Sequence, residues 1–317
     1  MSETPHLHQP ETGFLNTVSV YLEKRLIIIF LMGFASGLPF LLSGATLSIW
    51  LTEAGVSLTT IGLFTLVGTP YTVKYLWAPL IDWLPVPVLS KFLGRRRAWM
   101  VVIQLGLMGS IIGLGFSRPE STPLVTAVCA VLVAFFSASQ DIVIDAYRID
   151  ILDEDQQGAG AAMTQAGYRF GLLAAGAGAL YLATDIIWPL VYGIMAVLVL
   201  IGFITALLAP VPPADKAIGT ADRKGVSWFQ NAVIAPFAEF FQRNNVGSAI
   251  FILAFILLYK FGDAFAGVMA NPFYILIGFT KVEIANVSKI FGVFATLLGV
   301  FTGGLVVKRL GILKSLF

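Results

Sequence analysis

Long uncharged runs are the feature that most constrains how this chain can fold. The first run extends from Leu26 to Thr52 and covers 27 residues without a charge. A helix needs only about 18 such residues to cross the hydrocarbon core of a bilayer. Because 57% of all residues are hydrophobic and 12% are charged, we predict an all-α polytopic membrane protein. Eight spans are expected, at about residues 26–50, 58–80, 98–117, 122–145, 159–183, 187–209, 247–270 and 284–307.

A longer polar segment divides these spans into two groups. Residues 210–246 begin with three prolines in four positions and stay polar to Gly225, after which apolar residues recur at helical spacing. We therefore predict a cytoplasmic N-terminal segment (1–25), a six-helix bundle (26–209), a cytoplasmic linker with an interfacial helix (210–246) and two further spans (247–317).

The distribution of basic residues predicts the orientation in the membrane. With a cytoplasmic N-terminus, fourteen lysines and arginines fall in inner segments and only Arg118 and Lys281 fall in outer loops. Cytoplasmic loops of membrane proteins carry such an excess. The basic residues lie in short loops and not in one patch, so no nucleic-acid partner is expected.

Two carboxylates end the fourth uncharged run. Asp141 and Asp145 are four residues apart and therefore lie on one face of a helix. An ionised carboxylate is costly in a low dielectric, so at least one should be paired with a cation or protonated at neutral pH. Two interpretations are open: charges at a helix end that reach water or an arginine, or a buried acid site that handles protons or cationic partners.

An acidic residue and an arginine cluster join the second and third spans on the inner face. Asp82 comes first, and Gly94-Arg95-Arg96-Arg97 follows. This order looks like a stretched form of the acid-then-Gly-Arg-Arg loop of major facilitators. The arginines would pair with Asp82, Asp141 and Asp145 as a gating latch that holds one access state. The alternative is plain anchoring of the inner face by positive charge.

Three cations lie deep in predicted spans. Lys74 is in the second span, Arg169 in the fifth and Lys260 in the seventh. Ionisable groups at such depth usually face a bundle interior or an aqueous cavity. We expect Lys74 and Arg169 to find Asp141 and Asp145 across the bundle. Cations around a cavity suit a ligand that carries carboxylates or phosphates.

Lys260 also has an acid on its own helix. Asp263 follows three residues later, so the two side chains are neighbours and could neutralise each other as a structural pair.

A short repeat links the two groups of spans. Gly55-Val-Ser57-Leu-Thr-Thr-Ile61 and Gly278-Phe-Thr280-Lys-Val-Glu-Ile284 are offset by 223 residues. This offset would superpose spans one and two on spans seven and eight, as in parallel half-to-half repeats of transporters. Chance matching over so few residues is the alternative.

Five motifs in order, over nearly the whole chain from about residue 26, resemble the AmpG-type anhydromuropeptide permeases of the peptide/acetyl-CoA branch of the major facilitators. They are Gly33-Phe-Ala-Ser-Gly37-Leu-Pro39, Lys74-Tyr-Leu-Trp77-Ala-Pro79-Leu-Ile-Asp82, Ser137-Ala-Ser-Gln140-Asp141-Ile-Val-Ile-Asp145-Ala, Gly158-Ala-Gly160-Ala-Ala with Gly167-Tyr168-Arg169, and Tyr259-Lys260-Phe-Gly262-Asp263. The resemblance implies a bacterial inner-membrane importer of N-acetylglucosaminyl-1,6-anhydro-N-acetylmuramyl peptides in cell-wall recycling. It also implies a proton gradient as the energy source, with no cofactor, no metal and no enzymatic activity.

The expected roles combine the residues with this resemblance. Substrate binding is assigned to polar groups of the spans: Lys74, Gln140, Gln165, Tyr168, Arg169 and Lys260. Proton coupling is assigned to three acids: Asp141, Asp145 and Asp263. The gating latch is assigned to the inner motif: Asp82, Gly94, Arg95, Arg96 and Arg97. The expected partners are a lipid bilayer and an anionic small molecule or glycopeptide, and a monomer is the simplest assembly.

The length departs from the family, which has at least twelve spans, so a partial sequence with half of the second bundle is expected. Other interpretations stay open. An acyl-CoA or another anionic solute could be the substrate. Asp145 and Asp263 could form the dyad of a membrane aspartyl protease, or the chain could be a sensor or scaffold that moves no solute.

Overall fold

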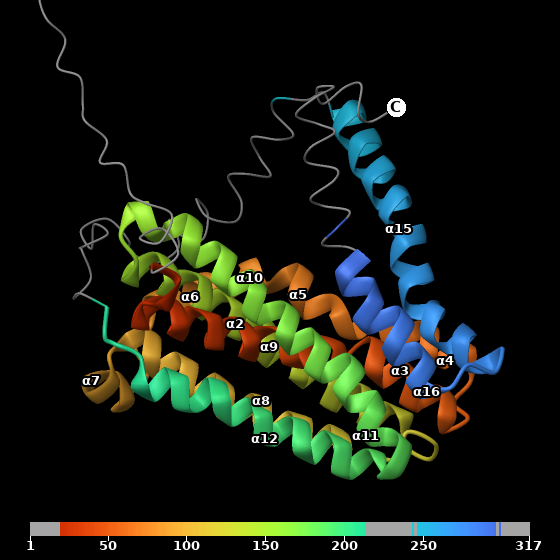
Figure 1. The fold of residues 1–317 in the computed structure, drawn as a ribbon. Helices are drawn as coiled ribbons and strands as arrows, with labels where there is room; N and C mark the ends of the chain where they lie inside the picture. Colours follow the sequence, from red (N-terminus) through yellow and green to blue (C-terminus); the bar gives the residue numbers. More distant parts are fainter. Residues whose placement is uncertain (1–19, 213–242, 244–245, 296–297, 299–317) are drawn as a thin grey trace, which may run out of the picture.

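A computed structural model describes residues 20–212, 243, 246–295 and 298 (Figure 1). Every regular element in these ranges is a helix, which confirms the predicted all-α class. The elements are η1 (Val20–Leu22), α2 (Lys24–Leu42), α3 (Ala45–Glu53), α4 (Leu58–Leu63), η2 (Phe64–Gly68), α5 (Thr69–Val73), η3 (Lys74–Leu76), α6 (Ala78–Trp83), α7 (Leu89–Leu93), α8 (Arg95–Gly115), α9 (Pro123–Ile151), η4 (Glu154–Gln156), α10 (Gln157–Leu173), η5 (Ala174–Gly178), α11 (Ala179–Asp185), α12 (Trp188–Leu208), α15 (Val246–Leu276), α16 (Lys281–Ile284) and η7 (Ala285–Phe291).

Four stretches of the described residues are long and apolar enough to cross a bilayer as continuous or nearly continuous helices. They are Lys24–Glu53, Arg95–Gly115, Pro123–Ile151 and Trp188–Leu208. These stretches correspond to the first, third, fourth and sixth predicted spans.

The second and fifth predicted spans are interrupted. The second passes through α4, η2, α5, η3 and α6, and prolines stand at the starts of α5 and α6, where a missing N–H costs least. The fifth continues from α10 through the π-helical turn η5 into α11. As a result, Lys74 lies in a 3₁₀ turn and not on a regular helix.

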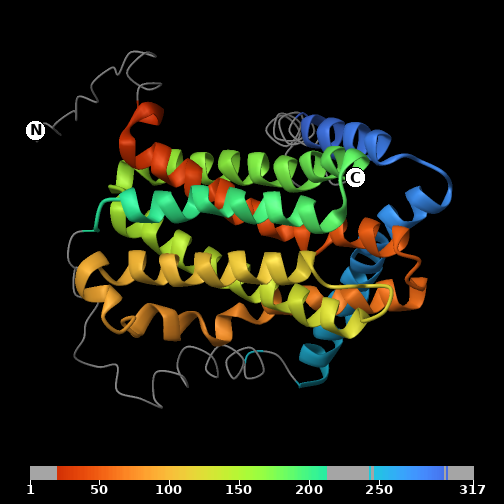
Figure 2. The ribbon, with the colours of Figure 1, turned by 90° about the horizontal axis from the view of Figure 1, so that it is seen from below.

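A seam of glycines holds α2 against α10. A Cβ atom at Gly37 would lie 2.1 Å from the carbonyl oxygen of Tyr168, and one at Gly167 would lie 2.0 Å from that of Phe30. Small residues one turn apart allow such close backbone approach. Around this seam, α12 packs along α8 and on α2, and α8 packs along α9. Figure 2 shows these helices side by side, with α2 crossing among them.

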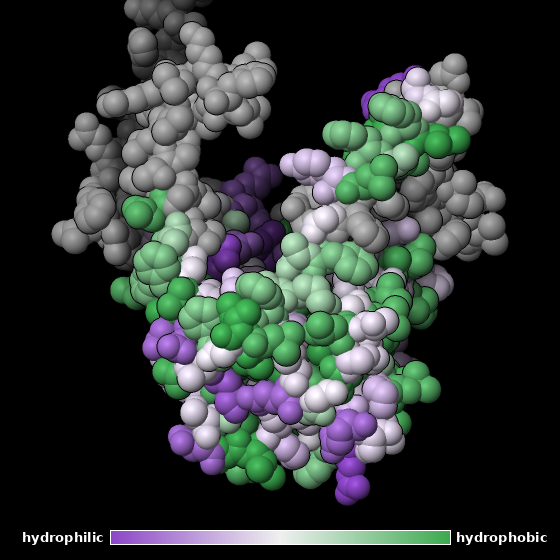
Figure 3. Space-filling model, turned by 90° about the vertical axis from the view of Figure 1, so that its right-hand side faces the viewer, coloured by the Kyte–Doolittle hydropathy of each residue, from purple (hydrophilic) through white to green (hydrophobic). Residues whose placement is uncertain are grey.

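The helices of the second group meet the first group at one end, which we call the α16 end. There α15 packs on α3 and α4, and α16 packs on α11. The Asn271 amide of α15 donates to the carbonyl oxygen of Ala45 at 3.5 Å. The opposite end of α15 leads away from the bundle (Figure 1). Figure 3 views the molecule from the α16 end, where polar patches on the surface alternate with apolar ones.

The two copies of the sequence repeat have the same local structure. Gly55 and Gly278 both have positive φ, at 73° and 98°. The N–H after each glycine bonds back five residues, from Val56 to Leu51 at 3.0 Å and from Phe279 to Tyr274 at 3.0 Å. This is the glycine-terminated Schellman pattern. Ser57 and Thr280 then cap the next helix in the same way, so the offset of 223 residues corresponds to a structural equivalence at this turn.

The predicted linker, with its interfacial helix, lies almost entirely outside the described residues. The four-part division of the chain therefore stays a prediction.

Candidate functional site

Asp141 lies where three elements meet. It is on α9, and its carboxylate accepts a hydrogen bond from the Ser36 hydroxyl of α2 at 2.6 Å. The Lys74 ammonium, in η3, lies 3.7 Å from the other carboxylate oxygen. The break in the second span brings Lys74 to this position. The expected pairing of Lys74 with Asp141 is therefore present, and a partly buried carboxylate has one cation and one neutral donor.

Asp145 has a different environment. Its side chain is 58% exposed and lies 3.7 Å from Arg148 on the same helix. Of the two interpretations of the acid pair, the helix-end charge with a neighbouring arginine describes Asp145, whereas the buried acid site describes Asp141.

The expected binding residues of α9 and α10 are dispersed. Gln140 is fully buried, and neither amide atom of its side chain has a hydrogen-bond partner within the described part of the chain. Gln165 is exposed. The Tyr168 ring packs at 6.5 Å from the Phe40 ring of α2. A buried amide without a partner costs about 1–3 kcal/mol, so Gln140 is a strong candidate for contact with a ligand.

The expected partners of Arg169 are wrong. The described residues show no ion pair between Arg169 and either Asp141 or Asp145, because Arg169 faces η7 across a small cavity instead. Lys289 of η7 lines the same cavity. The sequence interpretation missed Lys289, although a lysine inside the eighth predicted span was a visible signal.

The arginine motif forms a compact group at the opposite end of the bundle, which we call the α7 end. Arg96 pairs with Asp82 of α6, and its Nε donates to Asp150 of α9 at 3.0 Å. The expected pairing with Asp82 is therefore present, whereas the described residues show no ion pair between these arginines and Asp141 or Asp145, which corrects the rest of the expectation. Asp141 lies ten positions before the last residue of α9, Ile151, or about 15 Å along the axis, whereas Asp150 adjoins that end.

Gly94 and Arg97 anchor the same motif. Gly94 has a φ of 77°, a conformation that favours glycine. Arg97 donates to the carbonyl oxygens of Ala206, at 3.0 Å, and of Leu207 at the C-terminal end of α12. Cations are favourable at that end of a helix.

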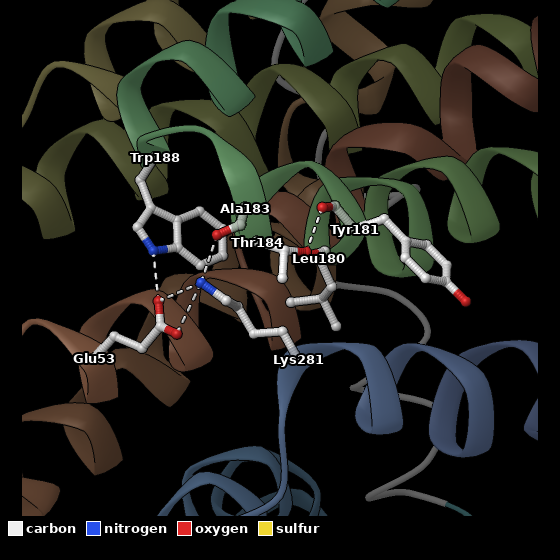
Figure 4. Close-up of polar contacts among 7 residues, drawn as sticks. All are labelled: Glu53, Leu180, Tyr181, Ala183, Thr184, Trp188 and Lys281. Atoms are coloured by element: carbon white, nitrogen blue, oxygen red, sulfur yellow. Dashed lines mark hydrogen bonds and ion pairs between the residues drawn. The ribbon is translucent and has the colours of Figure 1, made fainter.

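A second polar group lies at the α16 end, and the sequence interpretation did not anticipate it (Figure 4). Lys281 of α16 lies 3.0 Å from Glu53 of α3 and donates to the carbonyl oxygen of Ala183 at 2.5 Å. The Trp188 indole donates to Glu53 at 2.8 Å, and the Lys281 ammonium lies 5.7 Å from the Trp188 ring. This contact joins the two groups of spans across 228 positions of sequence.

The side chains of Lys260 and Asp263 lie outside the described residues. Their pairing, and the assigned roles in substrate binding and proton coupling, stay predictions.

These features define a multi-pass helical membrane protein with paired charges inside its bundle. The family model of the Major Facilitator Superfamily matches residues 27–317. A Rickettsia conorii protein named putative transporter AmpG 4 is 34% identical over 95% of this chain and 72% of the relative. The chain therefore belongs to the major facilitator superfamily and, within it, to the AmpG-type transporters.

Two other relatives have higher identities over a similar share of the chain. The anhydromuropeptide permease of Escherichia coli K12 is 41% identical over 94% of this chain, and the chain spans 58% of that relative's length. An uncharacterized Haemophilus influenzae protein is 38% identical over 94% of the chain and 68% of the relative.

Proposed function

We propose that this chain acts in the bacterial inner membrane as an importer of anhydromuropeptides for cell-wall recycling, with its N-terminus in the cytoplasm. Support comes from the 41% identity to a protein named as an anhydromuropeptide permease. The excess of basic residues in the predicted inner segments supports the orientation. We further propose that the proton gradient drives import.

The arrangement of Asp141 carries the proposed coupling. Its carboxylate is bonded to Ser36 of α2 and lies beside Lys74 of η3. Protonation would remove the charge that attracts Lys74 and so free η3 relative to α9. A change in charge that favours one of two conformations shifts their populations. Asp141 thus has the location that a coupling acid needs within a membrane.

Uptake of labelled anhydromuropeptide tests the proposal. Cells that lack their own permease would express this chain or, in parallel, this chain extended with the C-terminal part of the Escherichia coli relative. We expect uptake that a protonophore abolishes, and we expect Asp141→Asn to remove the protonophore-sensitive part. Asp145→Asn is the matched control, because Asp145 is exposed and pairs on its own helix.

The outcomes separate the parts of the proposal. If a well-inserted wild type takes up no muropeptide, and acyl-CoA competes with a ligand bound to it, acyl-CoA would replace muropeptides as the proposed substrate. Uptake by Asp141→Asn at the wild-type rate, still sensitive to the protonophore, would remove Asp141 from coupling.

A further inference from the structure

A cavity of about 260 Å³ lies between α10 and η7 and is lined by two cations. Arg169 enters it from α10 and Lys289 from η7, with Ser288 beside Lys289. No carboxylate is among the lining residues that the structure describes. Lys289 donates to the amide oxygen of Asn271 at 3.3 Å, which is a neutral partner.

The backbone makes room for Lys289. The π-helical turns η5 and η7 pack against each other, and Gly176 of η5 faces the lysine stem. A Cβ atom at Gly176 would lie 3.5 Å from the Cγ and Cδ atoms of Lys289 and 2.9 Å from a methyl group of Leu41. Single π-helical turns within α-helices are frequent at functional sites.

Two cations without an acid are an unfavourable lining for an empty cavity within a membrane. Partial burial removes hydration from the Arg169 guanidinium and from the Lys289 ammonium. A bound carboxylate would offset both losses, because charge-assisted hydrogen bonds to arginine and lysine are among the strongest in proteins. The lining therefore favours an anionic ligand.

A second cavity shares the Leu41 side chain with the first. It has a volume of about 370 Å³ and lies between α2, α3, η2, α5 and α15. The rings of Phe40 and Tyr71, whose centroids are 5.4 Å apart, line it together with Ser43 and Thr65. Aromatic faces and hydroxyls suit a sugar ring.

We propose that Arg169 and Lys289 together bind a carboxylate of the transported glycopeptide, while the neighbouring cavity holds a sugar ring. This subsite rests on the proposed function and assigns Lys289 to substrate recognition. It also places recognition at the contact between the two groups of spans, where a ligand can bias their relative position.

Binding measurements on the purified wild type and variants test the subsite. The probes are a labelled anhydromuropeptide and the same molecule with its peptide carboxylates amidated. Losing a hydrogen bond to a charged group weakens binding by about 10- to 100-fold. We expect wild type to bind the probe with free carboxylates more tightly than the amidated probe by this factor. Lys289→Gln and Arg169→Gln should lose this preference, while their affinity for the amidated probe stays that of the wild type.

Two further variants control the result. Lys289→Arg should keep the preference, and so should Arg118→Gln, which removes an exposed cation elsewhere. A disaccharide without the peptide, whose lactyl carboxylate is free, identifies which carboxylate binds. The proposed subsite would be overturned if Lys289→Gln weakened the binding of both probes equally, or if it left the preference for free carboxylates unchanged.

If neither probe binds to the wild type, this result counts against the proposed function. A second measurement, which does not use these probes, then tests the subsite. A cysteine in place of Ser288, with Cys129→Ser, reports access to the cavity by maleimide labelling. We expect glutarate, but not neutral glutaramide, to slow labelling, and Lys289→Gln to abolish this protection. Equal labelling with glutarate and glutaramide would contradict anion binding.

Discussion

The charged groups at the two ends of the bundle differ in what they connect. At the α7 end, Arg96 joins Asp82 and Asp150, which all belong to the first group of spans. At the α16 end, Lys281 of the second group joins Glu53 of the first. An ion pair within one group can persist while the groups move relative to one another. The pair between groups must break when α16 separates from α3, so the α16 end is the stronger candidate for a latch.

Burial strengthens this distinction. The Arg96 side chain is 11% exposed and has two carboxylates, whereas the Lys281 side chain is 19% exposed and has one. A more buried and doubly paired arginine stabilises a fixed structure, while a partly solvated pair of modest strength can open and close.

The largest effect is expected from Arg96→Ala. The substitution leaves two partly exposed carboxylates without their cation and should lower the free energy of unfolding by about 2 kcal/mol, less than for a fully buried pair. Thermal unfolding in detergent measures this loss, with Arg96→Lys as a control that keeps the charge but not the planar geometry. Wild-type stability of Arg96→Ala would show that the α7 end does not stabilise the first group.

A smaller and different effect is expected from Glu53→Gln. A glutamine retains an acceptor for Trp188 but loses the charge that attracts Lys281. The state in which α16 contacts α3 is in equilibrium with the state in which they are separated. We expect Glu53→Gln to shift this equilibrium toward separation by about 1 kcal/mol, or about fivefold in the ratio of the two states. Maleimide labelling of Ser48→Cys, in a Cys129→Ser background, reports the opening between α3 and α15 and should speed up about fivefold.

Exchange of the two charges sharpens this test. Glu53→Lys combined with Lys281→Glu should label more slowly than either single reversal, because the charge attraction returns. Labelling should stay faster than in wild type, because the bonds to the Trp188 indole and to the Ala183 carbonyl oxygen do not return. Arg96→Lys should leave labelling unchanged, because its partners lie within one group. Equal labelling rates in wild type and Glu53→Gln would argue that this contact does not hold the groups together.

The smallest effect is expected from the cap that positions Lys281. The backbone N–H and the hydroxyl of Thr280 donate to Glu283 at 2.8 and 2.9 Å, and these bonds lower the pKa of that carboxyl. Because the folded form has the lower pKa, the stabilisation is full above the ordinary glutamate pKa and fades as pH falls through the lowered value. Thr280→Val should therefore lower the melting temperature at neutral pH and have less effect in acid.

Ser57→Val is the matched control for this pH dependence. Ser57 caps the equivalent helix of the repeat, but Thr60 replaces the glutamate, so the effect of Ser57→Val should not change over the same pH range. A similar pH profile for both variants would mean that Glu283 contributes nothing to the cap.

Some tertiary contacts could be predicted from local patterns. Glycines recur in the fifth span, which favours close packing of helices, and Gly167 does meet the backbone of α2. The pairing of Lys74 with Asp141 could be predicted because few deep charges were available. The pairing of Arg96 with Asp150 and the surroundings of Arg169 could not be predicted. They depend on how far along its axis, and in which direction, each helix presents its charges.

The sequence by itself determined the helical class, four of the spans, the family and the repeated turn, because these follow from hydrophobicity, spacing and glycine conformation within short stretches. Only the tertiary structure decided that Asp150 replaces Asp141 beside Arg96, that Lys289 joins Arg169, and that Glu53 meets Lys281. These pairs join residues that are up to 228 positions apart. Such pairing is set by the rotation and depth of packed helices, which no local pattern encodes.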